Sequence, residues 1–237
     1  MKKILTMGIL LLFGAFIISC ESKINAMNYS ETNVNNNSNS SIENKLVETA
    51  SSKDTTVLTN DTKTLVIYSS FIGEQYSVGV IEKGNTEIVT DMIVEKLGAD
   101  RYKVEPKNDN YPKDSYKRLT EIASKELHNN ARPEIKDITF DISKYDIIYI
   151  GAPVWWGDFP MIMYTLFEKV DMNGKTIVPF STHGGSGLAG FDNKLKRLYP
   201  NANVTKGLAI TGTDAQNKKD NVKNEVDSFI DSLGLSK

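Results

Sequence analysis

Cysteine and histidine are scarce in this sequence, which has one cysteine and two histidines among 237 residues. A single cysteine excludes an internal disulfide, a cysteine-rich zinc site and a Cys-x-x-Cys redox pair. The two histidines, His128 and His183, leave little material for a histidine-based metal site. We therefore predict no metal site, and we expect any chemistry to use a bound organic cofactor or none.

An excess of positive charge is also missing, because 28 Lys and Arg stand against 30 Asp and Glu, for a formal net charge of −2. This balance argues against a polybasic nucleic-acid binder, and we expect no nucleic-acid partner. Hydrophobic residues at 40% and charged residues at 24% are typical of a globular protein rather than a disordered or multi-span membrane protein.

The N-terminal apolar run is too short for a membrane span. Two lysines precede an uncharged run from Ile4 to Ile18, whereas a spanning helix needs about 20 residues. The run therefore fits the core of a secretory signal peptide, predicted over residues 1–19. Its ending, Ile-Ile-Ser-Cys at Cys20, resembles the lipobox of bacterial lipoproteins. We expect Cys20 to be lipidated and to hold the protein on the outer side of a membrane in the bacterial cell envelope; the alternative is a signal anchor with an incidental cysteine.

Residues 20–60 are predicted to be the lipidated cysteine followed by a disordered tether. The segment from Asn28 to Ser41 is dominated by asparagine and serine and has no apolar periodicity that could be buried. Regular patterns begin at about Asp61, so residues 61–237 are predicted to form the folded domain.

In that domain, short apolar runs alternate with amphipathic segments. Strands are expected at 64–68, 101–105, 145–150, 176–180 and 204–210, and helices at 86–97, 115–128, 161–170, 191–199 and 222–233. This alternation predicts an α/β fold with a doubly wound, five-stranded parallel sheet and helices on both faces. Ligands bind such sheets beyond the carboxyl ends of the strands, where the winding reverses. The loops after the first, third and fourth strands should therefore converge.

The loop after the first strand ends at a helix start with Lys83, Gly84, Asn85 and Thr86. Glycine, an amide and hydroxyls at this position suit an anion such as phosphate, because the first N–H groups of a helix have no intrahelical acceptor. Asn85 or Thr86 could equally serve only as the N-cap of that helix. The glycine–lysine–serine spacing of a Walker loop is absent.

The loop after the third strand, residues 151–158, contains both tryptophans of the chain, Trp155 and Trp156. A proline-stiffened loop that presents a large flat side chain at a strand's carboxyl end suits stacking against a planar ring. The alternative is that one tryptophan fills the core while the other covers a surface helix.

The loop after the fourth strand is rich in glycine, reading Thr-His-Gly-Gly-Ser-Gly over residues 182–187. Glycines allow the backbone to approach a ligand closely. Residues 185–190 match Gly-x-Gly-x-x-Gly, but they follow the fourth strand and lack the downstream acidic residue of a dinucleotide site, which argues against that fingerprint. The His-Gly-Gly run suggests an esterase oxyanion loop, but the chain has no Gly-x-Ser-x-Gly elbow, so a serine hydrolase is not favoured.

Together these loops resemble the flavodoxin family, over Thr64 to Leu233. The family's phosphate loop reads like Ser-x-Thr-Gly-Asn-Thr; here Ser69 and Ser70 resemble its opening and Gly84 to Thr86 its close, with residues 71–82 inserted between them. Short flavodoxin-like proteins often carry Pro-x-Trp-Trp after the third strand and a loop similar to Thr-His-Gly-Gly-Ser-Gly after the fourth, and both motifs are present here.

The resemblance implies a flavodoxin-like sheet of order 2-1-3-4-5 that holds FMN noncovalently. It implies a phosphate on the first loop and an isoalloxazine ring between the other two, with Trp156 preferred over Trp155 as the ring contact and His183 as a residue that could tune the flavin. The residues expected to bind FMN are Ser69, Ser70, Lys83, Gly84, Asn85, Thr86, Pro153, Val154, Trp155, Trp156, Gly157, Thr182, His183, Gly184, Gly185, Ser186 and Gly187.

The function implied by this resemblance is redox chemistry on bound FMN. We expect a protein attached to a membrane only by its lipid that transfers electrons between partner proteins. Two alternatives remain open: an FMN oxidoreductase that uses NAD(P)H to reduce a quinone or another small-molecule acceptor, and a binding lipoprotein that has kept the fold without flavin.

Overall fold

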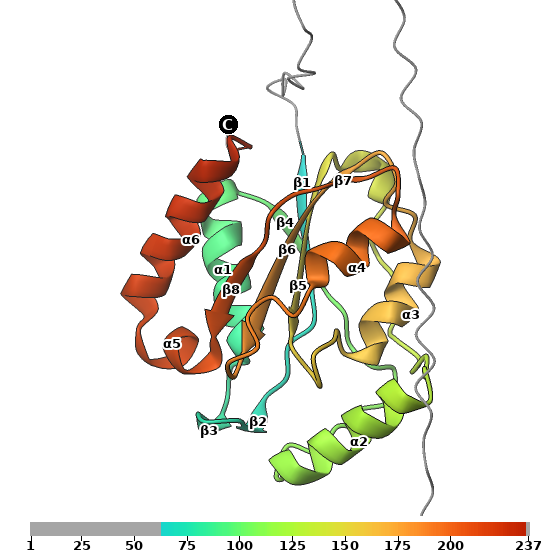
Figure 1. Ribbon diagram of the computed structural model, residues 1–237, viewed down its shortest axis with the longest axis vertical. Helices are drawn as coiled ribbons and strands as arrows, with labels where there is room; N and C mark the ends of the chain where they lie inside the picture. The colour runs from blue at the N-terminus through green and yellow to red at the C-terminus, as the bar shows by residue number, and fades with distance from the viewer. Residues whose placement is uncertain (1–62, 236–237) are drawn as a thin grey trace, which may run out of the picture. The chain divides into compact units, whose positions relative to one another are not determined.

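The computed structural model of this protein describes residues 63–235 (Figure 1). The predicted signal peptide, the lipidation site Cys20 and the predicted tether lie outside the described residues. No helix within residues 63–235 has the length and apolar character that crossing a membrane requires.

A parallel sheet forms the centre of the domain, in the order β4-β1-β5-β6, with β7 and β8 both pairing with β6. The strands are β1 Thr64–Tyr68, β4 Asp100–Lys103, β5 Ile147–Pro153, β6 Thr176–His183, β7 Asn203–Val204 and β8 Leu208–Thr211. Because β7 and β8 occupy the place of the fifth expected strand, this order confirms the predicted 2-1-3-4-5 winding.

The expected strand over 204–210 is broken in two. Pairing of β6 with β7 ends at Ile177 and pairing with β8 begins at Phe180. Pro179 lies in this gap and has no N–H to donate to a neighbouring strand. Gly207 approaches it closely, since a Cβ on Gly207 would lie 2.8 Å from the Pro179 carbonyl oxygen. A single uninterrupted strand was therefore the wrong prediction here.

Helices cover both faces of the sheet, as Figure 1 shows, with α1, α5 and α6 on one side and α3 and α4 on the other. The helices are α1 Asn85–Leu97, α2 Tyr116–His128, α3 Met161–Lys169, α4 Phe191–Leu198, α5 Gly212–Asn217 and α6 Lys219–Leu233, with a short 3-10 turn η1 at Ile142–Lys144. Helix α2 lies beyond the carboxyl edge of the sheet instead of on its face (Figure 1).

The core divides into two clusters because successive side chains of a strand point to opposite faces. From β1, Leu65 and Ile67 pack toward α3 and α4, whereas Val66 and Tyr68 pack toward α1 and α6. All four are at most 2% exposed. Burial on both faces explains why β1 reads as a continuous apolar run.

The insertion after β1 forms an antiparallel hairpin, with β2 at Gly73–Gln75 and β3 at Gly79–Ile81. Its turn uses positive φ angles, 59° at Ser77 and 72° at Gly79. The hairpin is tied to the start of α2, because the Tyr116 N–H donates to a Glu74 carboxylate oxygen at 2.8 Å. The insertion thus brings α2 against the same edge of the sheet as the three loops.

Candidate functional site

The loops after β1, β5 and β6 meet at a cleft of about 270 Å³ at the carboxyl edge of the sheet. Backbone hydrogen bonds join the loops: the Ser69 N–H donates to the Gly151 carbonyl and the Val154 N–H to the Thr182 carbonyl. The cleft is lined by Gln75, Tyr76, Asn85, Tyr116, Pro153, Val154, Trp155, Thr182, His183, Gly184, Ser186 and Gly212. Eight of the seventeen residues expected to bind FMN are among these lining residues.

The first loop closes tightly around the start of α1. Gly84 precedes the helix in an extended conformation, and a Cβ there would lie 2.1 Å from the Ser70 hydroxyl, so no larger residue fits. The Ser70 hydroxyl accepts the Glu87 N–H at 3.1 Å. The Ser69 hydroxyl is buried and has no hydrogen-bond partner among the described residues. The loop therefore contains one buried hydroxyl without a partner in the described part of the chain, and Ser69 is not among the residues that line the cleft.

Asn85 and Thr86 already have polar partners within the protein. The Asn85 side-chain oxygen accepts from the Gln216 amide at 2.8 Å. The Thr86 hydroxyl is buried and lies 2.8 Å from the Thr182 hydroxyl, which joins the first loop to the end of β6. Asn85 lines the cleft, whereas Thr86 is buried and is not among the lining residues.

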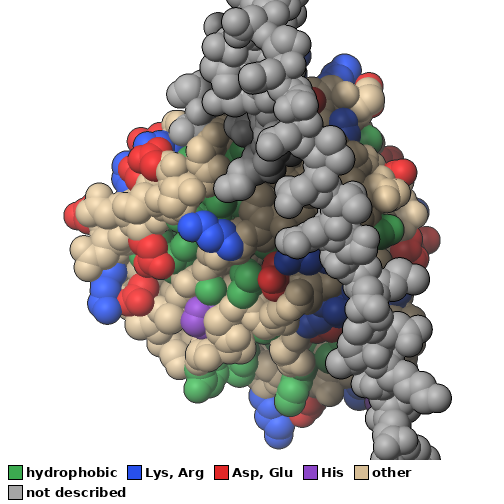
Figure 2. Space-filling view, turned by 45° about the horizontal axis from the view of Figure 1, so that its top comes forward, with side chains coloured by type: hydrophobic (Ala, Val, Ile, Leu, Met, Phe, Trp, Pro, Cys, Tyr) green, Lys and Arg blue, Asp and Glu red, His purple; other side chains and the backbone are tan. Residues whose placement is uncertain are grey.

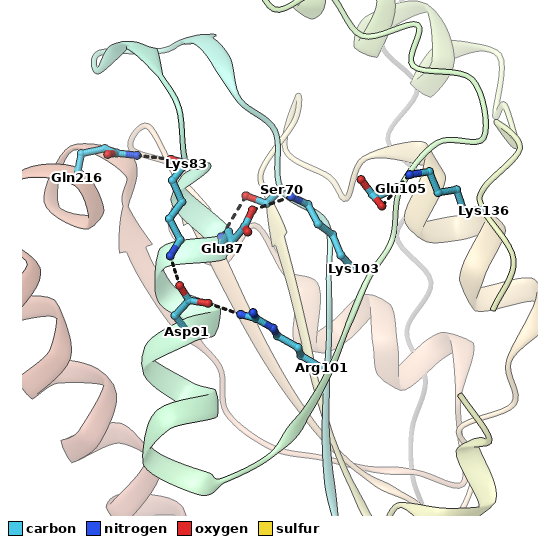
Figure 3. A network of polar contacts seen from close by, with 9 residues as sticks. All are labelled: Ser70, Lys83, Glu87, Asp91, Arg101, Lys103, Glu105, Lys136 and Gln216. Atoms are coloured by element: carbon cyan, nitrogen blue, oxygen red, sulfur yellow. Dashed lines mark hydrogen bonds and ion pairs between the residues drawn. The ribbon is translucent and has the colours of Figure 1, made fainter. Parts of the chain in front are cut away.

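Figure 3 shows where Lys83 points. Its ammonium pairs with Asp91, one turn and a half along α1, and Asp91 also pairs with Arg101 of β4. Next to them, Lys103 pairs with Glu87 at 2.6 Å. Lys83 thus points along the flank of α1, shares Asp91 with Arg101, and is not among the residues that line the cleft. Figure 2 shows basic and acidic side chains interspersed on the face in view, with neither sign forming a continuous patch.

The two tryptophans have different surroundings. Trp155 lines the cleft and is held from behind by Phe71 and Tyr111, with ring centroids 4.3 Å and 5.3 Å away. Trp156 is 62% exposed and turns toward α2, where its indole N–H donates to the Thr120 carbonyl at 2.9 Å. Trp156 and the adjacent Gly157 both have positive φ angles. Trp155, rather than the preferred Trp156, faces the cleft.

The glycine-rich loop after β6 is organised around His183. The His183 Nδ1 accepts the Gly185 N–H at 3.0 Å, and burial lowers the pKa of the imidazole. A nitrogen that accepts carries no proton, so the ring is neutral, with its proton on Nε2. The Ser181 hydroxyl donates to the Gly187 carbonyl at 3.0 Å, which fixes the far end of the loop.

Four lining residues were not anticipated from the sequence: Gln75, Tyr76, Tyr116 and Gly212. Tyr76 comes from the turn of the β2–β3 hairpin and lies against Gly184, where a Cβ would be 2.5 Å from the Tyr76 ring. Its ring centroid is 5.9 Å from that of Tyr116. The Tyr-Ser-Val-Gly stretch gives a weak turn signal. No local signal could have indicated Tyr116, whose spacing fits an ordinary apolar helix face.

Comparison with known proteins agrees with this geometry. The sequence profile of the flavodoxin family matches residues 76–229. A solved flavoprotein from Bacteroides eggerthii is 28% identical, with 70% of this chain and 97% of that chain covered and a TM-score of 0.54. A second solved flavoprotein, from Bacteroides uniformis, is 27% identical, with 70% of this chain and 97% of that chain covered and a TM-score of 0.53.

A flavoprotein from Lactobacillus acidophilus, solved in complex with FMN, is 25% identical to this chain. The alignment covers 65% of this chain and 95% of that chain, with a TM-score of 0.50. A search of curated proteins gives no match to this sequence. The family profile spans more than half of the chain, and the strand order and convergent loops agree with it. This chain therefore belongs to the flavodoxin family.

Proposed function

We propose that this protein binds FMN in the cleft between the β1, β5 and β6 loops and transfers electrons between partner proteins. The observation that carries the proposal is the convergence of these three loops, which lie far apart in the sequence, on one cleft. Family membership and the FMN complex of the Lactobacillus acidophilus relative support the choice of cofactor. When bound, FMN supplies one- or two-electron redox chemistry, while the protein orients it.

The phosphate end of the cleft has groups suited to FMN. The first turn of α1 presents N–H groups at Asn85 and Thr86 that have no intrahelical acceptor, and the helix dipole favours an anion there. The Ser70 hydroxyl already accepts the Glu87 N–H of this first turn, which leaves the Asn85 and Thr86 N–H groups for an anion.

The ring end of the cleft has groups suited to a flat aromatic system. Trp155 and Tyr76 provide aromatic surfaces, and Pro153 and Val154 provide apolar contacts. The loop from His183 to Gly187 brings backbone N–H groups to the same cleft, and such donors stabilise negative charge that reduction places on a flavin ring. Neutral His183 acts in this proposal by accepting the Gly185 N–H and so fixing the shape of the loop, not by supplying a positive charge.

An absorption spectrum tests this cofactor assignment. We expect the purified protein, after incubation with FMN and removal of free ligand, to retain about one flavin per chain with an absorption band in the blue. Mass spectrometry of the released cofactor should identify FMN. A protein that retains no flavin at micromolar concentrations would contradict the assignment and favour a binding function without cofactor.

We also propose that Cys20 anchors the protein to a membrane on its outer side. The support is the sequence ending of the N-terminal apolar run. A lipid anchor with more than one chain binds membranes stably, whereas a single chain binds marginally. Cys20→Ser should leave the precursor unprocessed or release the protein from the membrane fraction. Unchanged processing and fractionation of this variant would overturn the proposal.

A further inference from the structure

A second hollow adjoins the proposed flavin cleft. It is a groove of about 280 Å³ between α2 and the loop after β5. Its lining residues are Tyr116, Leu119, Thr120, Ala123, Val154, Trp155 and Trp156. Three of these residues, Tyr116, Val154 and Trp155, line the flavin cleft as well, so the two hollows share a wall.

Trp156 forms the outer side of this groove under conformational strain. Its φ of 53° lies in the left-handed region, which a bulky side chain rarely adopts. Such strain persists only where the surrounding structure enforces it, and it concentrates at functional sites. Here the indole N–H bonds to the Thr120 carbonyl at 2.9 Å while 62% of the residue stays exposed. The ring is therefore a large exposed aromatic surface held in one orientation.

The seven residues that line the groove indicate which kind of ligand it can bind. None of the seven side chains is charged, so a charged ligand would lose its hydration without gaining an ionic partner. Trp155, Trp156 and Tyr116 offer aromatic surfaces, which favour a planar ring system. The volume lies near the lower end of the range for small-molecule sites, about 300 Å³ and upward, which suits one or two fused rings.

Tyr116 adds a polar group to this apolar lining. Its hydroxyl makes no hydrogen bond to another described residue. Burial, reinforced by neighbouring Tyr76, raises the pKa of Tyr116, so the phenol remains protonated at neutral pH. A protonated phenol donates a hydrogen bond to a carbonyl oxygen. The groove therefore combines ring surfaces with a donor suited to a carbonyl.

We propose that this groove binds a neutral, planar molecule of the quinone class, with one or two rings, next to the flavin cleft. A role for that molecule as a small electron acceptor rests on the proposed FMN function, whereas its binding to the groove does not.

Isothermal titration calorimetry of the full-length protein with 2-methyl-1,4-naphthoquinone, with and without FMN and with no reductant, tests the site. We expect one saturable site per chain. A naphthoquinone sulfonate, which has the same rings and a negative charge, should bind at least fivefold more weakly. No saturable binding, or equal affinity for the two compounds, would overturn the proposal.

Three variants test whether the quinone binds in the groove. Trp156→Gly removes the ring at a φ that glycine adopts freely, and Thr120→Phe fills the groove; each should weaken the quinone at least fivefold. Glu121→Phe introduces the same ring at the next, exposed position of α2 outside the lining and should stay within twofold of wild type. Wild-type affinity in both groove variants would refute the site. A protein that retains no FMN but shows this pattern would contradict the proposed function and leave the quinone site standing.

Discussion

The buried hydroxyl pair between Thr86 and Thr182 provides a quantitative test of how the first loop is held to β6. The two oxygens lie 2.8 Å apart and the residues are 1% and 2% exposed. Thr86→Val removes one hydroxyl with little change of shape and leaves the Thr182 hydroxyl buried without its partner. Removal of one member of a buried pair costs about 1–3 kcal/mol, whereas replacement of both members is close to neutral.

The expected size of the effect follows from that asymmetry. A loss of about 2 kcal/mol, with a urea dependence of about 2 kcal/mol per molar, lowers the unfolding midpoint by about 1 M. Each single variant, Thr86→Val and Thr182→Val, should show a shift of this order. The double variant should lie close to wild type, so the coupling free energy should be close to the sum of the two single losses, about 4 kcal/mol.

Urea unfolding followed by far-ultraviolet circular dichroism measures the free energy of unfolding of wild type, the two single variants and the double variant. Thr90→Val is a matched control on the same helix, because the Thr90 hydroxyl is fully buried and has no partner among the described residues. Its removal should raise stability by about 1 kcal/mol. If the losses of the two single variants simply add in the double variant, the hydroxyls do not pair and the reasoning is refuted.

Three other changes test individual parts of the cleft. Asn85→Ala should weaken FMN by about 1–2 kcal/mol but riboflavin much less, because only FMN has the phosphate, and equal losses in fluorescence titrations would indicate damage to α1 instead. Tyr76→Ala should weaken FMN by about 1 kcal/mol with no change in melting temperature, since the residue is 56% exposed; wild-type affinity would remove Tyr76 from the site. The pKa of His183 is lowered in the folded protein, so the unfolded chain binds more protons below the ordinary value of 6.5, and stability falls as pH drops through the folded pKa. His183→Asn should flatten this dependence in melts between pH 7 and pH 5, and an unchanged slope would assign it to other groups.

The sequence predicted strand positions well where strands are buried on both faces. The run from Thr64 to Tyr68 matches β1 in full, because burial on both faces selects a continuous apolar segment. The carboxyl ends were placed too early: β5 and β6 each continue three residues beyond the predicted end, to Pro153 and His183. Those extra residues include small, polar and proline residues, which local propensity assigns to loops although they line the site edge.

The position of the cleft was predictable, but the partners of single side chains were not. Winding alone places the loops after β1, β5 and β6 together. The ion pair of Lys83 with Asp91 depends on how the loop enters α1. The turn of Trp156 toward Thr120 depends on a positive φ and on the location of α2. Tyr76 reaches Gly184 only because the inserted residues fold into a hairpin, which is a tertiary arrangement without a local signature.

Titration of the flavin-free protein with FMN, read by tryptophan fluorescence in wild type and in Trp155→Leu, tests the central claim most directly. Trp155 lines the cleft and Trp156 does not, so wild type should bind one FMN per chain with strong quenching. Trp155→Leu should lose most of the quenching and bind FMN at least tenfold more weakly while its melting transition stays cooperative. If wild type does not bind FMN, or if Trp155→Leu binds it with wild-type affinity, FMN does not occupy the cleft formed by the three loops.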